Sequence, residues 1–237
     1  MSHPPFGDGH YRAPITGLIA VPKPLYPRGV RRSGPMTGVL QPSHLSMLRS
    51  PEPGTHAILW SDGTSACDIA IETFLRGGVE RDDMVMVVMP RKELADLEER
   101  LRARGTDLDS MVDEGHLFRS LTEDVMPRHL EEVERMPRDM AAIWEFARSV
   151  GKEGLTVLDR IPALCFDRGK QEMAERIEQT AQDNRGASRM LCLYDGKNLS
   201  AERFSNAVSL TRMHTEALTA VGGGRFFIES TNGSLSP

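Results

Sequence analysis

The sequence contains little cysteine, few aromatic residues and no long hydrophobic run. Only Cys67, Cys165 and Cys192 occur among 237 residues, and an odd number of widely spaced thiols is not the pattern of a disulfide framework or a zinc motif. No segment approaches the roughly 20 consecutive apolar residues that a membrane-spanning helix needs. The N-terminus also lacks the charged and then apolar pattern of a signal peptide. We therefore expect a cytoplasmic protein without a membrane span.

An excess of basic residues is absent as well. The chain has 29 Lys and Arg against 34 Asp and Glu, for a net charge of -5. Such a balance excludes the general positive field by which proteins coat nucleic acid, and we predict no direct nucleic-acid binding. Hydrophobic residues make up 39% of the chain, enough for the core of one large domain.

The prolines are concentrated at the N-terminus. Residues 1–53 hold ten of the 15 prolines, and six basic residues against two acidic ones. Proline fixes φ and removes a backbone donor, which disfavours long helices and central strands. We predict an irregular, extended or disordered Pro-rich arm at 1–53 and a folded domain at 54–237. The arm is either a leader without a role or a strap that wraps a neighbouring subunit.

From His56 onward, short apolar runs alternate with amphipathic stretches, which is typical of a parallel sheet covered by helices. Strands are predicted at 57–60, 84–89, 117–121, 155–158 and 190–194, with an edge strand at 225–228. Helices are predicted at 65–76, 91–104, 137–150, 170–182 and 200–214, the first of them closed by Gly77 and Gly78. We therefore predict an α/β fold with a mostly parallel central sheet flanked by helices.

The first strand-to-helix turn, at 61–68, is where such a fold would hold a phosphate group. The turn has Gly63 and two carboxylates, Asp62 and Asp68, but no lysine. A functional P-loop needs a second glycine and a lysine on the phosphates, so ATP binding of that kind is excluded. Asp159 ends a strand as a Walker-B acid would, yet it has no magnesium nucleotide to serve. We expect no catalytic residues and no cofactor.

Several short motifs resemble a known family by their order and spacing. They are His56 before an apolar strand, Phe74 to Val79 with Asp82 and Asp83, Gly105 with Asp107, Gly115 with Leu117, Glu178, and Leu191 to Asp195 followed by Phe204 and His214. Over about 54–216 this pattern resembles the MEDS domain, the sensory domain named after methanogens and the methylotroph regulator DcmR. The pattern departs from the family at Asp159 to Pro162, which has no tryptophan, and at Thr215 after the histidine.

This resemblance implies a RecA/KaiC-like three-layer sandwich that lacks a functional P-loop. It further implies a sensor of small, apolar ligands. Because no output domain is recognisable in the chain, the partner, such as a regulator or a kinase, would be acted on in trans. Two alternatives stay open: a scaffolding subunit that forms a homo-oligomer through this domain and the arm, and a degenerate nucleotide-dependent ATPase.

A ligand pocket is expected at the carboxyl ends of the parallel strands, where open α/β sheets bind their ligands. The predicted ligand-binding residues are His56, Trp60, Ser61, Asp62, Thr64, Asp159, Tyr194, Asp195 and His214. The seven histidines are too scattered for a local metal motif, so no metal residues are predicted. A metal site would require residues that the fold brings together. Cys192 lies within a predicted strand and is interpreted as a packing residue.

Overall fold

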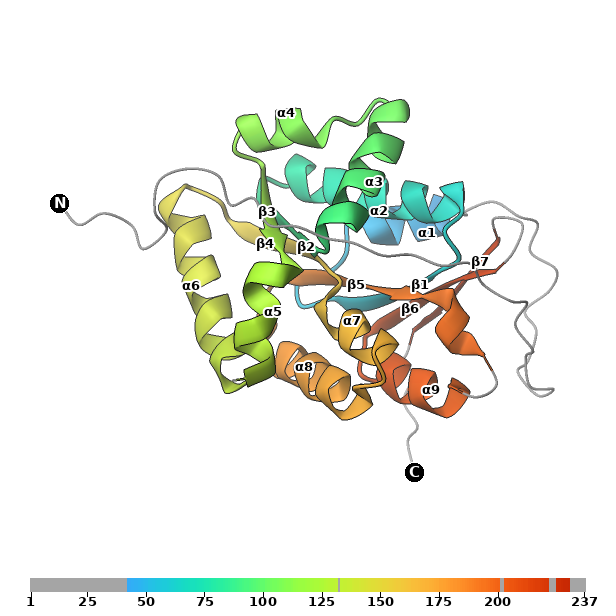
Figure 1. The fold of residues 1–237 in the computed structure, drawn as a ribbon. Coiled ribbons are helices and arrows are strands. Elements are labelled where there is room, and N and C mark those ends of the chain that lie inside the picture. The colour runs from blue at the N-terminus through green and yellow to red at the C-terminus, as the bar shows by residue number, and fades with distance from the viewer. Residues whose placement is uncertain (1–41, 132, 201–202, 222–224, 231–237) are drawn as a thin grey trace.

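The computed structural model describes residues 42–131, 133–200, 203–221 and 225–230. A central sheet lies between two layers of helices, as Figure 1 shows. This arrangement confirms the predicted three-layer α/β sandwich. Within the described residues, no helix is long and apolar enough to cross a bilayer.

The sheet has seven strands in the order β3-β2-β4-β5-β1-β6-β7. Five of the neighbouring pairs are parallel, and β7 pairs antiparallel with β6 at one edge. The strands are β1 (His56–Ser61), β2 (Asp83–Met89), β3 (Leu117–Leu121), β4 (Gly154–Asp159), β5 (Arg189–Asp195), β6 (Glu216–Val221) and β7 (Arg225–Ser230). Strands β1, β2 and β4 are buried along almost their whole length because helices cover both faces.

One face of the sheet carries the helices from the first part of the chain. These are α1 (Pro42–Arg49), α2 (Ser65–Glu80), α3 (Arg91–Ala103) and α4 (Leu108–Asp113). Apolar side chains recur at helical spacing in α3, where Leu94, Leu97 and Leu101 are buried. They join the core on this face with Leu59 of β1 and Val87 of β2.

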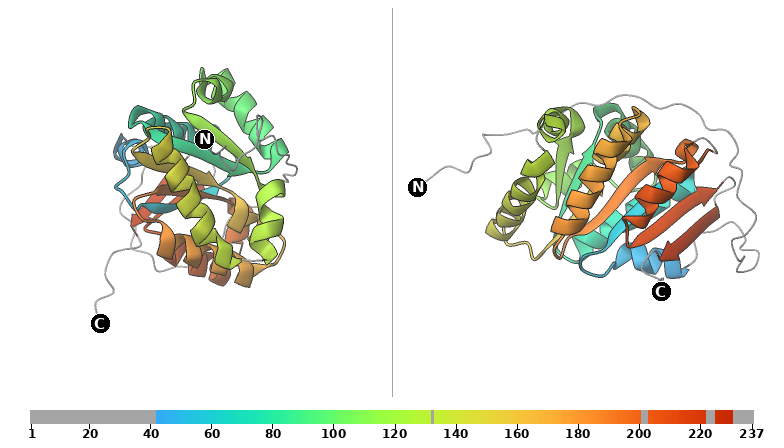
Figure 2. Two further views of the ribbon diagram at one scale, coloured as in Figure 1. Left: turned by 90° about the vertical axis from the view of Figure 1, so that its left-hand side faces the viewer. Right: turned by 90° about the horizontal axis from the view of Figure 1, so that it is seen from below.

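The other face carries the later helices, and Figure 2 shows α8 and α9 lying across the sheet in the view from below. The elements are α5 (Thr122–Glu131), the short η1 (Val133–Arg135), α6 (Met136–Ser149), α7 (Ile161–Asp167), α8 (Gln171–Asn184), η2 (Gly196–Leu199) and α9 (Phe204–Arg212). A second core forms here around Ile58, Trp60, Cys192 and Tyr194. The alternation of side chains along each strand separates the two cores.

Most predicted elements are present, and the ones not anticipated are short. The bounds of β3 agree with the prediction. Strands β1, β4 and β5 are one residue longer at each end than predicted, and β2 begins one residue earlier. The sequence reading did not anticipate α1, α4, α5, α7 and β6. It also extended the last helix to 200–214, whereas α9 comprises Phe204–Arg212.

The prediction that Gly77 and Gly78 close the first helix is wrong, because α2 continues to Glu80. Both glycines instead allow close packing inside the helix. A Cβ atom on Gly78 would lie 2.8 Å from Val85 Cγ2 and 2.9 Å from Thr156 Cβ. A Cβ atom on Gly77 would overlap the carbonyl oxygen of Arg49. The glycine pair therefore seats α2 against the sheet on one side and the end of α1 on the other.

Part of the predicted arm is folded onto the domain. Residues 42–49 form helix α1, which packs on α2, and its Leu48 is only 1% exposed. Arg189 Nε also donates a hydrogen bond to the carbonyl oxygen of Pro51 at 2.8 Å. The irregular conformation predicted for 1–53 therefore does not hold for 42–49, because burial of one apolar helix face outweighs the flanking prolines. Residues 1–41 lie outside the described residues.

The close approach of Gly77 to α1 predicts that a larger residue at position 77 destabilises the protein. Glycine-to-alanine changes inside helices usually add about 1 kcal/mol of stability, but Gly77→Ala places a methyl group against the Arg49 carbonyl. We expect the free energy of unfolding in urea to fall by about 1–3 kcal/mol. In a chain that starts at residue 50, the same change should raise stability. If Gly77→Ala changed the free energy of unfolding in the same direction in both chains, the packing role of Gly77 would be contradicted.

Candidate functional site

The parallel pairing of β1 with β5 places five side chains on one face of the sheet. Ile58 is in register with Cys192, and Trp60 with Tyr194. Since alternate residues of a strand share a face, His56 lies on this same side as Ile58 and Trp60. Helices α8 and α9 cover this face, so the polar atoms here are enclosed between strands and helices.

Four side chains from different elements meet there, and we call them the buried tetrad: His56 of β1, Glu178 of α8, Cys192 of β5, and His214 between α9 and β6. Their ligand atoms all lie within 4.8 Å of one another. Glu178 Oε2 is 3.1 Å from His56 Nε2 and 3.3 Å from His214 Nε2. The Cys192 Sγ atom is 3.3 Å from His56 Nε2 and 3.5 Å from Glu178 Oε2. Every member is buried.

A second set of groups holds the tetrad in place. His56 Nδ1 donates to the side-chain oxygen of Gln182 at 3.0 Å, and His214 Nδ1 donates to the carbonyl oxygen of Leu210 at 2.8 Å. Both contacts direct the Nε2 atoms toward Glu178. The Tyr194 hydroxyl donates to Glu178 Oε1 at 2.7 Å, so the two carboxylate oxygens have different partners. The orientation of each ring and of the carboxylate is thereby fixed.

The charges in the tetrad depend on one another. Burial alone would raise the pKa of Glu178, but the His214 and His56 imidazoles hold it well below its usual range. Burial raises the pKa of the Cys192 thiol, and the Glu178 carboxylate raises it further. Burial and the same carboxylate also raise the pKa of Tyr194. Glu178 is therefore the anion of the site, while the thiol and the phenol keep their protons.

Asp159 ends β4 beside this cluster. Burial raises its pKa to about 7, and the Glu178 carboxylate adds to this, although backbone N–H groups of Ile161 and Arg160 oppose it. Its Oδ1 accepts the Ile161 N–H at 2.8 Å, at the start of α7. Asp159 thus links the electrostatics of the cluster to the first turn of α7, as a turn residue rather than as a metal-nucleotide ligand.

The loop after β1 is closed by its own hydrogen bonds. Gly63 N donates to Ser61 Oγ at 3.1 Å, and Thr64 N donates to Asp62 Oδ1 at 3.0 Å. The carboxylate of Asp68, in the first turn of α2, is paired with Arg100 at 2.9 Å. The backbone donors that a phosphate would need at Gly63 and Thr64 are therefore bonded within the loop itself.

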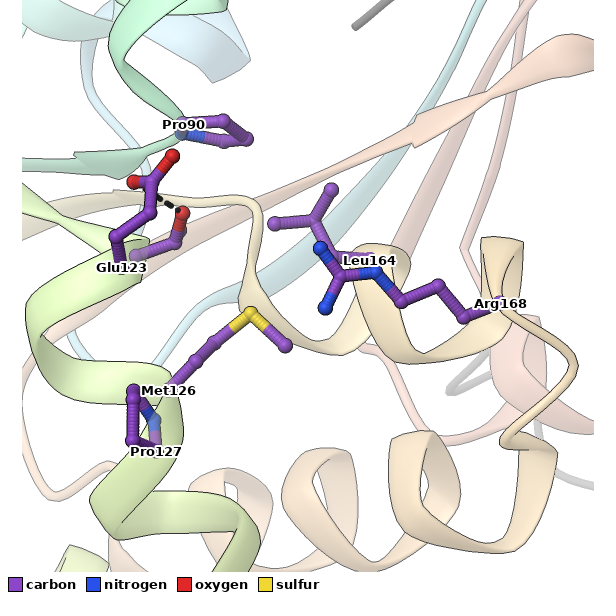
Figure 3. Close-up of a pocket in the computed structure, with 7 residues that line it drawn as sticks. Pro90, Glu123, Met126, Pro127, Leu164 and Arg168 are labelled. Carbon is purple, nitrogen blue, oxygen red and sulfur yellow. Dashed lines mark hydrogen bonds between the residues drawn. The ribbon is translucent and has the colours of Figure 1, made fainter. Parts of the chain in front are cut away.

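A cleft of about 390 Å³ opens at the carboxyl ends of β2, β3 and β4. Figure 3 shows Met126 of α5 facing Leu164 and Arg168 across it, with Pro90 above and Glu123 beside them. Its lining comprises Pro90, Thr122, Glu123, Met126, Pro127, Leu164 and Arg168. The walls are mainly apolar, with one guanidinium and one carboxylate near the opening. Such a lining suits a small apolar molecule with a polar end.

The structure divides the nine predicted site residues into two groups. His56, Trp60, Tyr194 and His214 lie together in the core: the Trp60 and Tyr194 rings are 4.8 Å apart, and Trp60 Nε1 donates to Thr211 Oγ1 at 3.1 Å. Ser61, Asp62, Thr64, Asp159 and Asp195 lie at the carboxyl ends of the strands or in the loops that follow. Asp195 accepts the backbone N–H of Lys197 and pairs with its ammonium group at 2.6 Å. None of the nine lines the cleft of Figure 3.

The sequence predicts other roles for two residues of the tetrad. Glu178 is part of the family resemblance only, and the position of Cys192 within a strand predicts a packing role. A buried glutamate in an amphipathic helix offers a signal, since glutamate is almost never fully buried without a partner, but the helix pattern alone does not name that partner. The cleft residues of α5 and α7 were missed because neither helix was predicted.

Comparison with known proteins gives one family and a distant structural neighbour. The family model MEDS, described as the methanogen/methylotroph, DcmR sensory domain, matches residues 55–214. The crystal structure of a KaiC-like protein from the hyperthermophilic archaeon Pyrococcus horikoshii OT3 is similar, with a TM-score of 0.49 and 15% identity. The match covers 77% of this chain and 82% of that one. No curated protein matches the chain.

The raised pKa of Asp159 predicts a specific pH dependence of stability. An unfolded Asp loses its proton near pH 3.8, whereas folded Asp159 keeps it until about pH 7. Between these values the folded state binds more protons, so this residue lowers stability as pH rises. The stability of Asp159→Asn relative to wild type should therefore increase from pH 4 to 7, by at most about 1.4 kcal/mol per pH unit.

Urea unfolding of both proteins at each pH measures this difference, and the contributions of all other groups cancel in it. Asparagine also accepts the Ile161 N–H, so the first turn of α7 is preserved. A difference that stays constant from pH 4 to 7 would show that Asp159 titrates like an exposed carboxyl group.

Proposed function

The chain belongs to the MEDS family, and on this premise we propose that it is a non-catalytic sensory domain that binds a small, mainly apolar ligand and regulates a partner protein in trans. The family match covers residues 55–214, which include the sheet up to β5 and the helices on both of its faces. A sensory role accords with the family's description. The ligand and the partner are the additional parts of the proposal.

The cleft at the carboxyl ends of β2, β3 and β4 is the observation that carries the proposal. Open α/β sheets bind ligands at this edge. Met126, Leu164 and Pro90 offer apolar contact, and Arg168 offers one positive charge beside them. Methionine adapts its shape to different ligands because its side chain is flexible and polarizable. A compact apolar molecule with an anionic or polar end fits this lining.

The helix that forms one wall of the cleft is coupled to the rest of the fold. Arg160, just before α7, is buried and pairs with Glu93 of α3 at 2.9 Å and with Asp167 of α7 at 3.1 Å. It also donates to the carbonyl oxygen of Leu193 in β5 at 3.2 Å. A ligand that shifts α7 therefore acts on α3 across the sheet, which provides a route from the cleft to a surface that a partner can contact.

The absence of catalysis is supported by the loop after β1. Asp62 and Asp68 stand where a nucleotide-binding loop has a lysine, and a triphosphate would face two carboxylates. The backbone N–H groups of Gly63 and Thr64 already donate to side chains of the loop. These features favour a sensor over a nucleotide-dependent enzyme.

Native mass spectrometry of the purified protein tests the ligand. We expect a small molecule bound at about one per chain, released on denaturation and identified by its mass. Leu164→Trp fills the cleft with a larger side chain and should lower the bound fraction at least tenfold. The control is Val150→Trp, because Val150 is 46% exposed and lies outside the cleft.

Other results would change the assignment. A bound nucleotide, or hydrolysis of Mg-ATP, would overturn the non-catalytic role. An empty chain that forms a defined oligomer, and that loses this oligomer when residues 1–41 are removed, would favour the scaffolding alternative. A ligand retained at full occupancy in Leu164→Trp would place the binding site outside the cleft.

A further inference from the structure

We propose that the buried tetrad, His56, Glu178, Cys192 and His214, binds a divalent transition-metal ion in a tetrahedral site, and that Zn²⁺ is the ion it suits best. This site is separate from the ligand cleft, since none of the four residues lines the cleft. The geometry and chemistry of the four side chains support the metal site, whichever small ligand binds in the cleft.

Four of the distances between ligand atoms of the tetrad are close to those between the ligands of one ion, and all four atoms lie within 4.8 Å of one another. Zinc lies about 2.0–2.2 Å from nitrogen or oxygen ligands and about 2.3 Å from sulfur. In a tetrahedron these bond lengths place neighbouring ligand atoms roughly 3.3–3.6 Å apart. The separations from Glu178 Oε2 are 3.1, 3.3 and 3.5 Å, and His56 Nε2 lies 3.3 Å from Cys192 Sγ.

The same distances are poor for a network of hydrogen bonds alone. His56 Nε2, His214 Nε2 and the Cys192 thiol all approach one oxygen, Glu178 Oε2, which has only two lone pairs. Charge-assisted hydrogen bonds are usually about 2.7–2.9 Å long, whereas these nitrogen contacts are 3.1 and 3.3 Å. Glu178 Oε1, in contrast, has an ordinary bond of 2.7 Å from Tyr194. An ion among the four atoms accounts for their convergence and for the length of the two nitrogen contacts to Glu178 Oε2.

The surroundings of the tetrad are those of a metal site. A ligating histidine almost always donates its other ring N–H to a carbonyl or carboxylate oxygen. Here His56 donates to Gln182 and His214 donates to the backbone of Leu210, which leaves both Nε2 atoms directed at the ion. Tyr194 holds the free oxygen of Glu178 in the same way. Three of the four ligands, His56, His214 and Glu178, are thus oriented by groups outside the tetrad.

Charge balance favours a divalent cation. When the ion binds, the Cys192 thiol loses its proton to solvent, and the thiolate forms the metal–sulfur bond. Two anionic ligands, Glu178 and Cys192, and two neutral imidazoles then make the complex with a divalent ion neutral. Neutrality matters because all four side chains are buried, where an unbalanced charge is costly.

The ligand types select among the divalent ions. Magnesium and calcium prefer oxygen ligands and higher coordination numbers. A thiolate, two imidazoles and one carboxylate in a tetrahedral arrangement instead suit zinc. Gln182 is partly exposed on α8 and is the member of the surrounding groups nearest to solvent. Because the ligands themselves are fully enclosed, we expect the ion to enter during folding or through local opening of α8.

Cobalt(II) is a spectroscopic substitute for zinc and provides the test. The full chain is unfolded with a chelator, refolded without metal and titrated with Co²⁺. We expect one ion per chain, intense visible absorption typical of tetrahedral Co²⁺, and an ultraviolet band from charge transfer between the Cys192 thiolate and the metal. Added Zn²⁺ should displace the cobalt, and elemental analysis of the protein as purified should find about one zinc per chain.

Three variants separate this site from adventitious binding. Cys192→Ser should abolish the thiolate band, whereas Cys67→Ser, which alters a buried thiol outside the tetrad, should keep it. Gln182→Ala leaves all four ligands in place and should weaken Co²⁺ binding about 10- to 100-fold, as loss of groups that orient metal ligands usually does. Circular dichroism checks that each variant is folded.

The cobalt experiments test the metal site separately from ligand binding in the cleft. Leu164→Trp should bind Co²⁺ as tightly as wild type does. Folded wild-type protein that shows no tetrahedral Co²⁺ spectrum and contains no stoichiometric zinc would overturn the metal site, without affecting the sensory proposal. A spectrum that survives unchanged in Cys192→Ser would overturn it too, because the ion would then lie elsewhere.

Discussion

The buried carboxylate of Glu178 is the polar contact that joins helix α8 to the sheet, on the face where α8 and α9 pack through apolar side chains. Glu178 is enclosed between the sheet and α8, where an anion is stable only with partners that compensate for lost hydration. Its partners come from β1, β5 and the segment before β6: His56, Cys192, Tyr194 and His214. Contacts to one carboxylate therefore connect α8 to two strands and to the segment between α9 and β6, and they bring metal-ligating atoms together in the core.

The two proposed sites share a face of the sheet but differ in depth and chemistry. The cleft opens to solvent at the carboxyl ends of β2, β3 and β4, and α7 forms one of its walls. The tetrad lies beneath α8, which packs directly against α7. Asp159, at the end of β4 just before α7, lies near enough to the tetrad for the Glu178 carboxylate to raise its pKa.

The loop after β1 uses its own side chains to bind its backbone N–H groups. Asp62 uses its carboxylate to bond Thr64 N, and Ser61 uses its hydroxyl to bond Gly63 N. Backbone donors that a phosphate would otherwise occupy are thus consumed locally. Gly77 and Gly78 have a packing role, because the absence of a side chain allows α2 to approach both α1 and the sheet.

The sequence by itself determined the α/β class, the strands β2 to β5 and the lack of a phosphate-binding lysine, because continuous apolar runs and missing residue types are local properties. Short helices such as α5 and α7 were missed because fewer than three turns give too little periodicity to read. Only the tertiary structure decided the cleft between those helices and the tetrad. His56, Glu178, Cys192 and His214 are far apart in the chain, and it is the parallel register of β1 with β5, covered by α8, that brings their polar atoms within 4.8 Å.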